Sequence, residues 1–273
     1  MKMRNIFLFI AAVLSGTDIQ AQTATADASH TVYVVDISAR NLSLKAVDSY
    51  PQKLLAVIYL YDTIKTVRIS TFNPYEDKER GSAVKNAIYN PQAKYPAHIS
   101  RFLKPTKYVN SRSRITESVA DTLFDGTEKT CFDVITKALS FSKRTVFDSE
   151  LAAALDAGKS MTEPSDSAII RGKGTCSEAT NIFLALMRRK GIPARMVVGY
   201  CYEPEYKVNG SHAWAECYIE GAGWWPVDPQ NGHPSLPYFC YKLFTGKDFR
   251  DCRIKTLPDM YLRGDYHFKA VKP

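Results

Sequence analysis

The apolar residues near the start of the chain occur in short runs that are rich in β-branched and aromatic side chains, a pattern that predicts strands. The three runs are 31–37 (TVYVVDI), 54–61 (LLAVIYLY) and 66–71 (TVRIST). The second run has no two-residue alternation, so a buried helix is an alternative for it. Residues 72–110 mix Pro, Asn, Lys and Tyr without a period, and we expect them to be irregular. This first part of the chain gives no chemical signal.

From about residue 113 the apolar period changes to that of helices. The spacing is carried by Ile115, Val119 and Leu123 in one run, and by Phe132, Ile135 and Leu139 in the next. A third short helix is predicted over 149–158, which is rich in Ala and Leu and ends at Gly158. We interpret these helices as packing for the segment that follows.

A longer helix comes next, and it leads into strands. Apolar residues at helical spacing from Ala179 to Met187 predict this helix, basic residues occupy its last turn, and Gly191 stops it. Strands are then predicted at 194–202, 211–220 and 223–229. Asn209–Gly210 predicts a turn between the first two of them. The order indicates an α+β fold in which helices pack on an antiparallel sheet.

The start of that longer helix is the most informative point in the chain. Thr175-Cys176-Ser177-Glu178 matches the capping box S/T-x-x-E, which places Cys176 at the first helical position. There the helix dipole and the free N–H groups favour a thiolate, and the N–H of Cys176 would face a developing oxyanion. Gly172 and Gly174 leave room for a substrate to approach the sulfur. A buried, inert cysteine is the alternative, and the cap alone does not separate the two.

A thiol catalyst also needs a base and a group that orients the base. His212 lies on a predicted strand and Asp228 at the end of the next, so neighbouring antiparallel strands could join them as a Cys–His–Asp triad. Taken singly, each is as readily structural. His233 is a poorer candidate because it follows Asp228 in a turn. Glu216 would lie about 13 Å along the strand from His212, too far to orient it.

Together these segments resemble a family. The stretch GKGTCSEAT, then LMRRKGIPARMVVGY, then SHAWAECYIEGAGWWPVDPQ, is similar to the transglutaminase-like core. That family typically shows a G-x-C helix start, a GIPAR-x-V-x-GY strand, an HAW-x-E strand and a GW-x-P-V-D-P ending. The motifs occur here in that order over residues 171–231, and a weaker resemblance extends back to about residue 113.

The resemblance implies a papain-like α+β fold with Cys176 as nucleophile, His212 as base and Asp228 as orienting acid. Such enzymes attack amide bonds and form an acyl-enzyme thioester, which an amine resolves by crosslinking or water by hydrolysis. The calcium dependence of the animal enzymes finds no acidic loop motif in this sequence, and we expect no cofactor and no metal. The family's second oxyanion donor lies outside the matched segment. We interpret Trp214 as packing beside the site and one of Trp224 and Trp225 as core.

The first residues have the order of a secretory signal peptide. Lys2 and Arg4 form a basic start, 6–14 is a short apolar run, and small-residue cleavage sites follow near residues 21 and 26. A membrane-anchored N-terminus is the alternative, but a span needs roughly 20 apolar residues, about twice this run. We therefore predict a protein exported from a bacterial cytoplasm, periplasmic or secreted, without stable membrane insertion.

Charge and cysteines refine this prediction. The net charge of +8 comes from dispersed basic residues without a nucleic-acid-binding motif, so we interpret it as solubility and expect no nucleic-acid partner. Six cysteines are present. If Cys176 is a free nucleophile, at least one more must be unpaired. Cys201 with Cys217, or Cys240 with Cys252, are alternative bridges that the sequence does not decide.

The predicted organisation has three parts: 1–26 as signal peptide and leader, 27–110 as a small β-rich region of unknown role, and 111–273 as the catalytic domain. The predicted function is a cysteine hydrolase or acyltransferase that acts on protein or peptide amides. A noncatalytic protein- or glycan-binding module with the same fold is the first alternative. A structural envelope protein stapled by disulfides, with Cys176 itself bridged, is the second.

Overall fold

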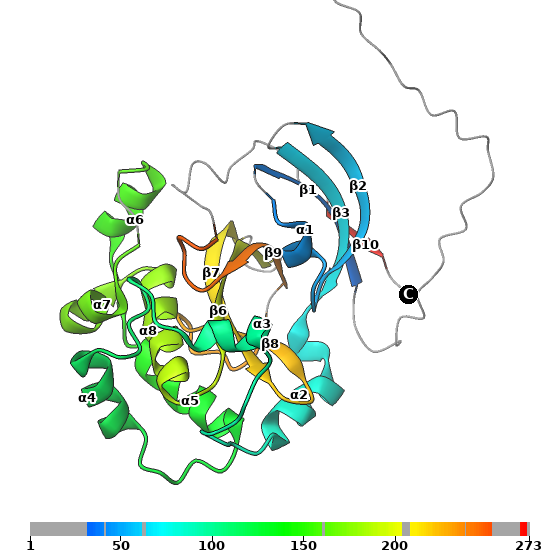
Figure 1. The fold of residues 1–273 in the computed structure, drawn as a ribbon. Helices are drawn as coiled ribbons and strands as arrows, with labels where there is room; N and C mark the ends of the chain where they lie inside the picture. Colours follow the sequence, from blue (N-terminus) through cyan, green and yellow to red (C-terminus); the bar gives the residue numbers. More distant parts are fainter. Residues whose placement is uncertain are drawn as a thin grey trace, which may run out of the picture.

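A computed structural model describes residues 32–40, 42–61, 64–159, 162–203, 208–237, 239–252 and 268–271. The described residues form two four-stranded antiparallel sheets and a group of helices (Figure 1). The α+β prediction is confirmed. The predicted signal peptide and its cleavage sites lie outside the described residues.

The first sheet contains all three strands predicted near the start of the chain. It has the order β10-β1-β3-β2, with β1 (Val32–Arg40), β2 (Lys53–Tyr61), β3 (Ile64–Phe72) and β10 (Phe268–Val271). The run LLAVIYLY is thus a strand, and the helix alternative is wrong. Two register shifts in β2, between Leu54 and Ala56 and between Val57 and Tyr59, explain why it lacks alternation. As an edge strand, β2 leaves Leu55 and Leu60 48% and 63% exposed.

Residues 72–110 contain more regular structure than the sequence predicts. After α1 (Leu44–Val47) come the 3-10 turn η1 (Pro74–Glu76), α2 (Lys78–Asn86), α3 (Ala97–Ser100) and the 3-10 turn η2 (Arg101–Leu103). The expectation of an irregular segment is therefore wrong for α2. That helix begins where the side chain of Asp77 accepts a hydrogen bond from the N–H of Arg80, and Val84 is its buried residue, so it has no apolar stripe to detect.

The predicted helices form around one central helix. They are α4 (Arg114–Leu123), α5 (Cys131–Ser142), α6 (Ser149–Asp156) and the central α8 (Cys176–Arg189), whose residues from Ser177 to Arg188 are all buried. The sequence analysis missed the short α7 (Ser165–Arg171) and the paired strands β4 (Val146–Phe147) and β5 (Lys173–Gly174). In Figure 1, α8 lies between these helices and the second sheet.

The second sheet has the order β8-β7-β6-β9 and carries the segment that follows α8. Its strands are β6 (Ala194–Glu203), β7 (Val208–Ile219), β8 (Gly223–Val227) and β9 (Phe239–Gly246). The predicted turn at Asn209–Gly210 is wrong, because both residues pair with β6 as the first part of β7. The connection between the two strands lies at 204–207, outside the described residues.

One continuous core joins both sheets and the helices. Val35 and Ile69 of the first sheet belong to the same buried cluster as Leu184 of α8 and Val198 of β6. The side chain of Gln52 also donates to the carbonyl of Lys242 on β9, at 3.1 Å. The division of the chain near residue 110 stays a prediction.

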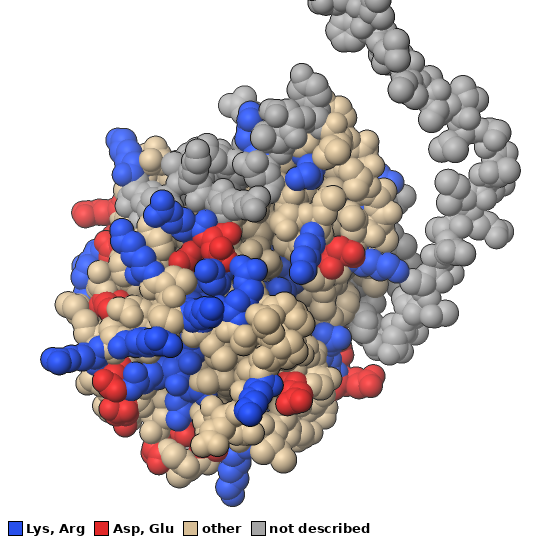
Figure 2. All heavy atoms as spheres, in the orientation of Figure 1, with Lys and Arg blue, Asp and Glu red and all other residues tan. Residues whose placement is uncertain are grey.

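The cysteines pair differently from both alternatives. Cys201 and Cys240 form a disulfide because they lie directly opposite each other on β6 and β9. Cys131, Cys176, Cys217 and Cys252 are free thiols. No helix among the described residues is long and apolar enough to span a membrane. Figure 2 shows Lys and Arg spread over the visible face, with Asp and Glu among them.

Candidate active site

The start of α8 is built as the capping box predicts. Thr175 is the N-cap, and its N–H and hydroxyl both donate to Oε2 of Glu178 at 2.7 Å. The other carboxylate oxygen of Glu178 accepts from the hydroxyl of Thr162 at 2.8 Å and from the N–H of Glu163 at 2.7 Å. Glu178 has no exposed surface. This buried carboxylate therefore ties the helix start to the preceding segment and fixes Cys176 at the first helical position.

The two glycines before Cys176 have structural tasks that the sequence interpretation did not assign to them. Gly172 ends α7 in the left-handed region, at φ 63°. Gly174 packs against Glu178, where an added Cβ would lie 2.3 Å from the Cβ of the glutamate. The space that Gly174 leaves is thus filled by Glu178, not kept open for a substrate.

The structure brings His212 and Asp228 together across the sheet. His212 lies on β7, and Asp228 directly follows the neighbouring strand β8. Nε2 of the imidazole lies 3.0 Å from Oδ2 of Asp228. Since Nε2 faces the carboxylate, Nδ1 is the ring nitrogen left for the thiol of Cys176.

The charges around His212 favour its protonated form. Burial alone would lower the pKa of the imidazole, but the Asp228 carboxylate and hydrogen bonding to the Cys176 side chain outweigh burial and raise the pKa to about 10. In the opposite sense, burial would raise the pKa of Asp228, and His212 together with Asn231 holds it below its ordinary value. The imidazolium and the carboxylate thus stabilise each other, with Asp228 fully buried and the side chain of His212 11% exposed toward the pocket.

A tight turn after β8 orients the Asp228 carboxylate. Oδ1 accepts from the N–H of Gln230 at 2.9 Å, and Oδ2 accepts from the side-chain amide of Asn231 at 2.9 Å. The backbones of Asp228 and His233 exchange two hydrogen bonds that close the turn. The sequence analysis missed Asn231, although an amide three residues after an acid in a turn is a usable signal. His233 contributes its backbone here.

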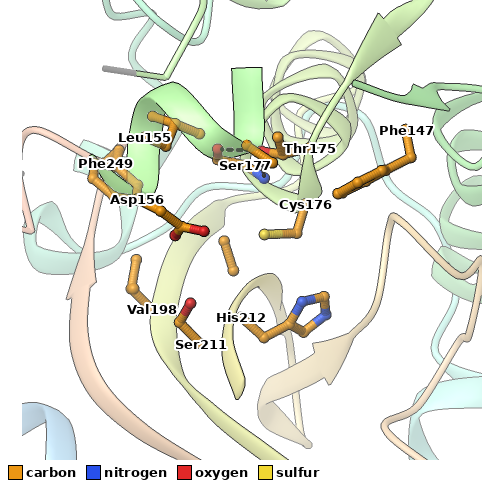
Figure 3. A pocket seen from close by; sticks show the side chains of 12 residues that line it. Phe147, Leu155, Asp156, Thr175, Cys176, Ser177, Val198, Ser211, His212 and Phe249 are labelled. Carbon is orange, nitrogen blue, oxygen red and sulfur yellow. Dashed lines mark hydrogen bonds between the residues drawn. The ribbon is translucent and has the colours of Figure 1, made fainter. Parts of the chain in front are cut away.

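Cys176 and His212 line the same pocket, which has a volume of about 180 Å³ (Figure 3). Its apolar walls include Leu155 of α6, Val198 of β6 and Phe249. The carboxylate of Asp156 points into the pocket, and Phe147 lies on the other side of Cys176 in this view. The thiol thus meets the imidazole inside a cavity that could hold a substrate side chain.

Comparison with known proteins finds a family segment in this chain. Residues 145–229 match the family model of the transglutaminase-like superfamily. The chain carries a transglutaminase-like core. The match covers the motif segment 171–231 except for its last two residues, and it extends upstream to strand β4.

Individual relatives are distant from this chain. An uncharacterized protein of Mycobacterium leprae is 34% identical over 85 residues, which are 29% of this chain and 29% of the relative's own length. A crystal structure from Cytophaga hutchinsonii, described as that of a candidate cysteine protease, covers 89% of this chain and 90% of its own, with a TM-score of 0.56 at 18% identity. That structure supports the fold over nearly the whole chain. A candidate protease from Parabacteroides distasonis aligns with a TM-score of 0.31 at 13% identity, over 71% of this chain and 37% of its own.

Glu216, the alternative to Asp228 as the acid that orients His212, contacts other residues. Glu216 is fully buried, and its carboxylate contacts Lys242 Nζ at 2.6 Å and Arg195 Nε at 2.7 Å. Both cations hold its pKa below the ordinary value against the effect of burial. Glu216 therefore does not orient His212.

None of the three tryptophans lines the pocket of Cys176 and His212. Trp214 is buried, and its ring centroid lies 6.2 Å from that of His212, so it packs beside the imidazole. Trp225 belongs to the hydrophobic core, and Trp224 contacts the Arg195 guanidinium. Among the described residues, no group of three or more His, Cys, Asp or Glu side chains is arranged to hold a metal ion.

Proposed function

We propose that the protein is an exported cysteine hydrolase that cleaves amide bonds of proteins or peptides, with Cys176 as nucleophile, His212 as base and Asp228 as orienting acid. One observation carries the proposal. The thiol at a helix start shares a pocket with an imidazole whose far nitrogen is bound to a buried carboxylate. This is the order of contacts that activates a thiol for acyl transfer.

The proposed cycle begins from the thiol of Cys176 and a neutral His212, and the raised pKa of the imidazole favours transfer of the Cys176 proton to it. The imidazolium is stabilised by Asp228, which does not take the proton. The thiolate then attacks the substrate carbonyl, and the N–H groups at the start of α8 stabilise the oxyanion. His212 protonates the departing amine as the C–N bond breaks, which leaves a thioester on Cys176. Water, deprotonated by His212, attacks the thioester, and the acid and the free thiol are released.

The shape of the pocket favours water over an amine as the acceptor. Phe147 and Asp156 at its rim are exposed, and Cys176 itself is partly exposed. Among the described residues, this pocket is open to solvent. It is not a narrow apolar tunnel, which would exclude water until an amine arrives. The description of the Cytophaga hutchinsonii protein as a candidate cysteine protease points the same way.

Export is supported by two independent features. The first residues have the order of a signal peptide. The Cys201–Cys240 disulfide also fits an oxidising compartment such as the periplasm or the extracellular medium. A protein or peptide substrate in that compartment is part of the proposal.

The test measures ammonia release from a Gln-containing peptide and cleavage of fluorogenic peptide amides, each with and without a primary amine. We expect hydrolysis that the amine does not accelerate. Cys176→Ala should reduce both signals to background, whereas Cys131→Ala, which also removes a cysteine at a helix start, should retain them. Full activity of Cys176→Ala would contradict the mechanism. Incorporation of the amine in place of hydrolysis would identify a transferase.

A further inference from the structure

The pocket beside Cys176 combines apolar walls with one carboxylate from the described residues. Leu155, Val198 and Phe249 are at most 5% exposed and form the walls. Asp156 is the acidic side chain of the lining. A cavity of this kind suits a side chain with an apolar stem and a charged end, since the stem is buried while the end keeps a polar partner.

Asp156 is available to a ligand. It is the last residue of α6, it is exposed, and its side chain makes no hydrogen bond or ion pair with the described residues. Lys159 follows three positions later and forms no ion pair with it in that part of the chain. By contrast, Asp148 at the other end of the same helix is engaged by Arg171 and by the N–H of Leu151.

The charge around Asp156 has the opposite sign to the net charge of the whole molecule. The chain carries a net charge of +8, so its overall field favours anions. Asp156 lies instead at the C-terminal end of α6, where the helix carbonyls add partial negative charge. Figure 3 shows its carboxylate directed into the pocket that holds Cys176. A cation that binds at Asp156 is therefore favoured by the groups beside it, while the positive charge of His212 in the same pocket is paired with Asp228.

We propose that the acyl-donor substrate carries a cation, either a Lys or Arg side chain or a free α-amino group, next to the carbonyl that Cys176 attacks, and that Asp156 binds this cation. The proposal rests on the proposed function, because it names the substrate class of the same site. The apolar stem of the substrate's Lys or Arg side chain would lie against Leu155 and Phe249. Asp156 is thus a specificity-determining residue.

The test compares acetylated peptide coumarin amides that differ at the cleaved residue, which is Lys, norleucine or Glu. The readout is the ratio of kcat/KM for Lys to that for norleucine. We expect Asp156→Asn to lower this ratio about fivefold, as for a partly solvated ion pair, and Asp156→Lys to favour the Glu peptide. Glu150→Gln removes an exposed carboxylate from the same helix away from the pocket, and it should leave the ratio unchanged. An equal ratio in wild type and Asp156→Asn would overturn the proposal.

Two further measurements identify which cation Asp156 binds and distinguish a failure of this inference from a failure of the proposed function. A norleucine amide with a free N-terminus, compared with its acetylated form, reports an α-amino group as the bound cation. If wild type cleaves none of the peptides, the proposed function fails. Binding of the same peptides, labelled for fluorescence polarisation, to Cys176→Ala and to Cys176→Ala with Asp156→Asn then decides the inference. A preference for the cationic peptide that depends on Asp156 upholds it, and the absence of that preference overturns it.

Discussion

Two helices of this protein begin with the same local pattern and present their cysteines to different surroundings. The first is α5, which starts at Thr130-Cys131-Phe132-Asp133, and the second is α8, which starts at Thr175-Cys176-Ser177-Glu178. Both starts form complete capping boxes, with the threonine as N-cap and the acid at the third helical position. Each cysteine therefore has the same helix dipole and the same type of free N–H groups beside it.

The difference lies in what faces each thiol. Burial raises the pKa of the Cys131 thiol to about 11, and its sulfur contacts the carbonyl of Ile88 at 3.7 Å. Cys176 instead shares a pocket with His212, whose position is fixed from the far side by Asp228. A capped helix start thus places a cysteine, but a base from another element is needed to make it a candidate nucleophile.

The largest effect we expect comes from removing Asp228, the acid that distinguishes the surroundings of Cys176 from those of Cys131. Asp228→Asn keeps the shape of the side chain but no longer stabilises the imidazolium, so kcat/KM should fall about 10⁴-fold, as in related triads. The measurement is peptide-amide hydrolysis, with thermal unfolding and near-ultraviolet circular dichroism as controls for the fold. A loss of less than tenfold in a folded variant would show that Asp228 has no part in the chemistry.

The next prediction compares the two thiols directly. At pH 7 we expect iodoacetamide to modify Cys176 about 100-fold faster than Cys131, because a thiol with a pKa near 11 is almost entirely protonated there. Peptide mass spectrometry after timed quenching gives both rates in one sample. His212→Gln should remove most of the difference. Labelling of Cys176 only after denaturation would instead favour a noncatalytic binding module.

The two helix starts also show how far the sequence could lead. The capping box placed Cys176 correctly, but the equal box at Cys131 shows that the pattern has no catalytic meaning alone. His212 and Asp228 were ambiguous as single residues because their contact joins neighbouring strands, and family motifs selected them. The disulfide between Cys201 and Cys240 also joins neighbouring strands. It was not predicted because Cys240 lies on β9, a strand that the sequence analysis did not identify. The motifs gave no sign of Asp156, because α6 appeared to serve packing alone.

A third prediction compares the acids of the two capping boxes. Glu178 is fully buried and accepts hydrogen bonds from Thr162, Glu163 and Thr175, whereas Asp133 is partly exposed and accepts from the backbone of Lys129 and Thr130. Glu178→Gln turns an amide group toward donors, so it should lower the free energy of unfolding by about 1–3 kcal/mol. Asp133→Asn should have a smaller effect. Urea denaturation measures both, and equal losses would contradict a special role for the buried network.

The smallest effect is a pH dependence of stability that belongs to the α8 site. The folded-state pKa of His212 is raised from 6.5 to about 10, so its stabilising contribution is fully present below pH 6.5 and is lost as the pH rises toward 10. The α5 site responds only at higher pH. The protonated Cys131 thiol stabilises the folded state, and this contribution is lost as the pH rises above 9.0, the ordinary pKa of the thiol, toward about 11. Lys242, whose pKa burial lowers to about 8, acts in the opposite sense above that pH.

The interval from pH 6.5 to 8 therefore isolates His212 from both of these groups. One proton held by the folded state and not by the unfolded state gives a fall of up to about 1.4 kcal/mol per pH unit. Urea denaturation at half-unit steps should show this fall in wild type and in Cys131→Ala, and should not show it in His212→Gln. A wild-type stability that stays level over the interval would mean that the folded site binds no more protons than the unfolded chain. His212 would then be either neutral or protonated by the thiol of Cys176, because a proton passed between the two leaves the total unchanged. Cys176→Ala separates these cases: a fall in this variant alone assigns the proton of His212 to Cys176, and a level stability in both proteins contradicts the raised pKa of His212.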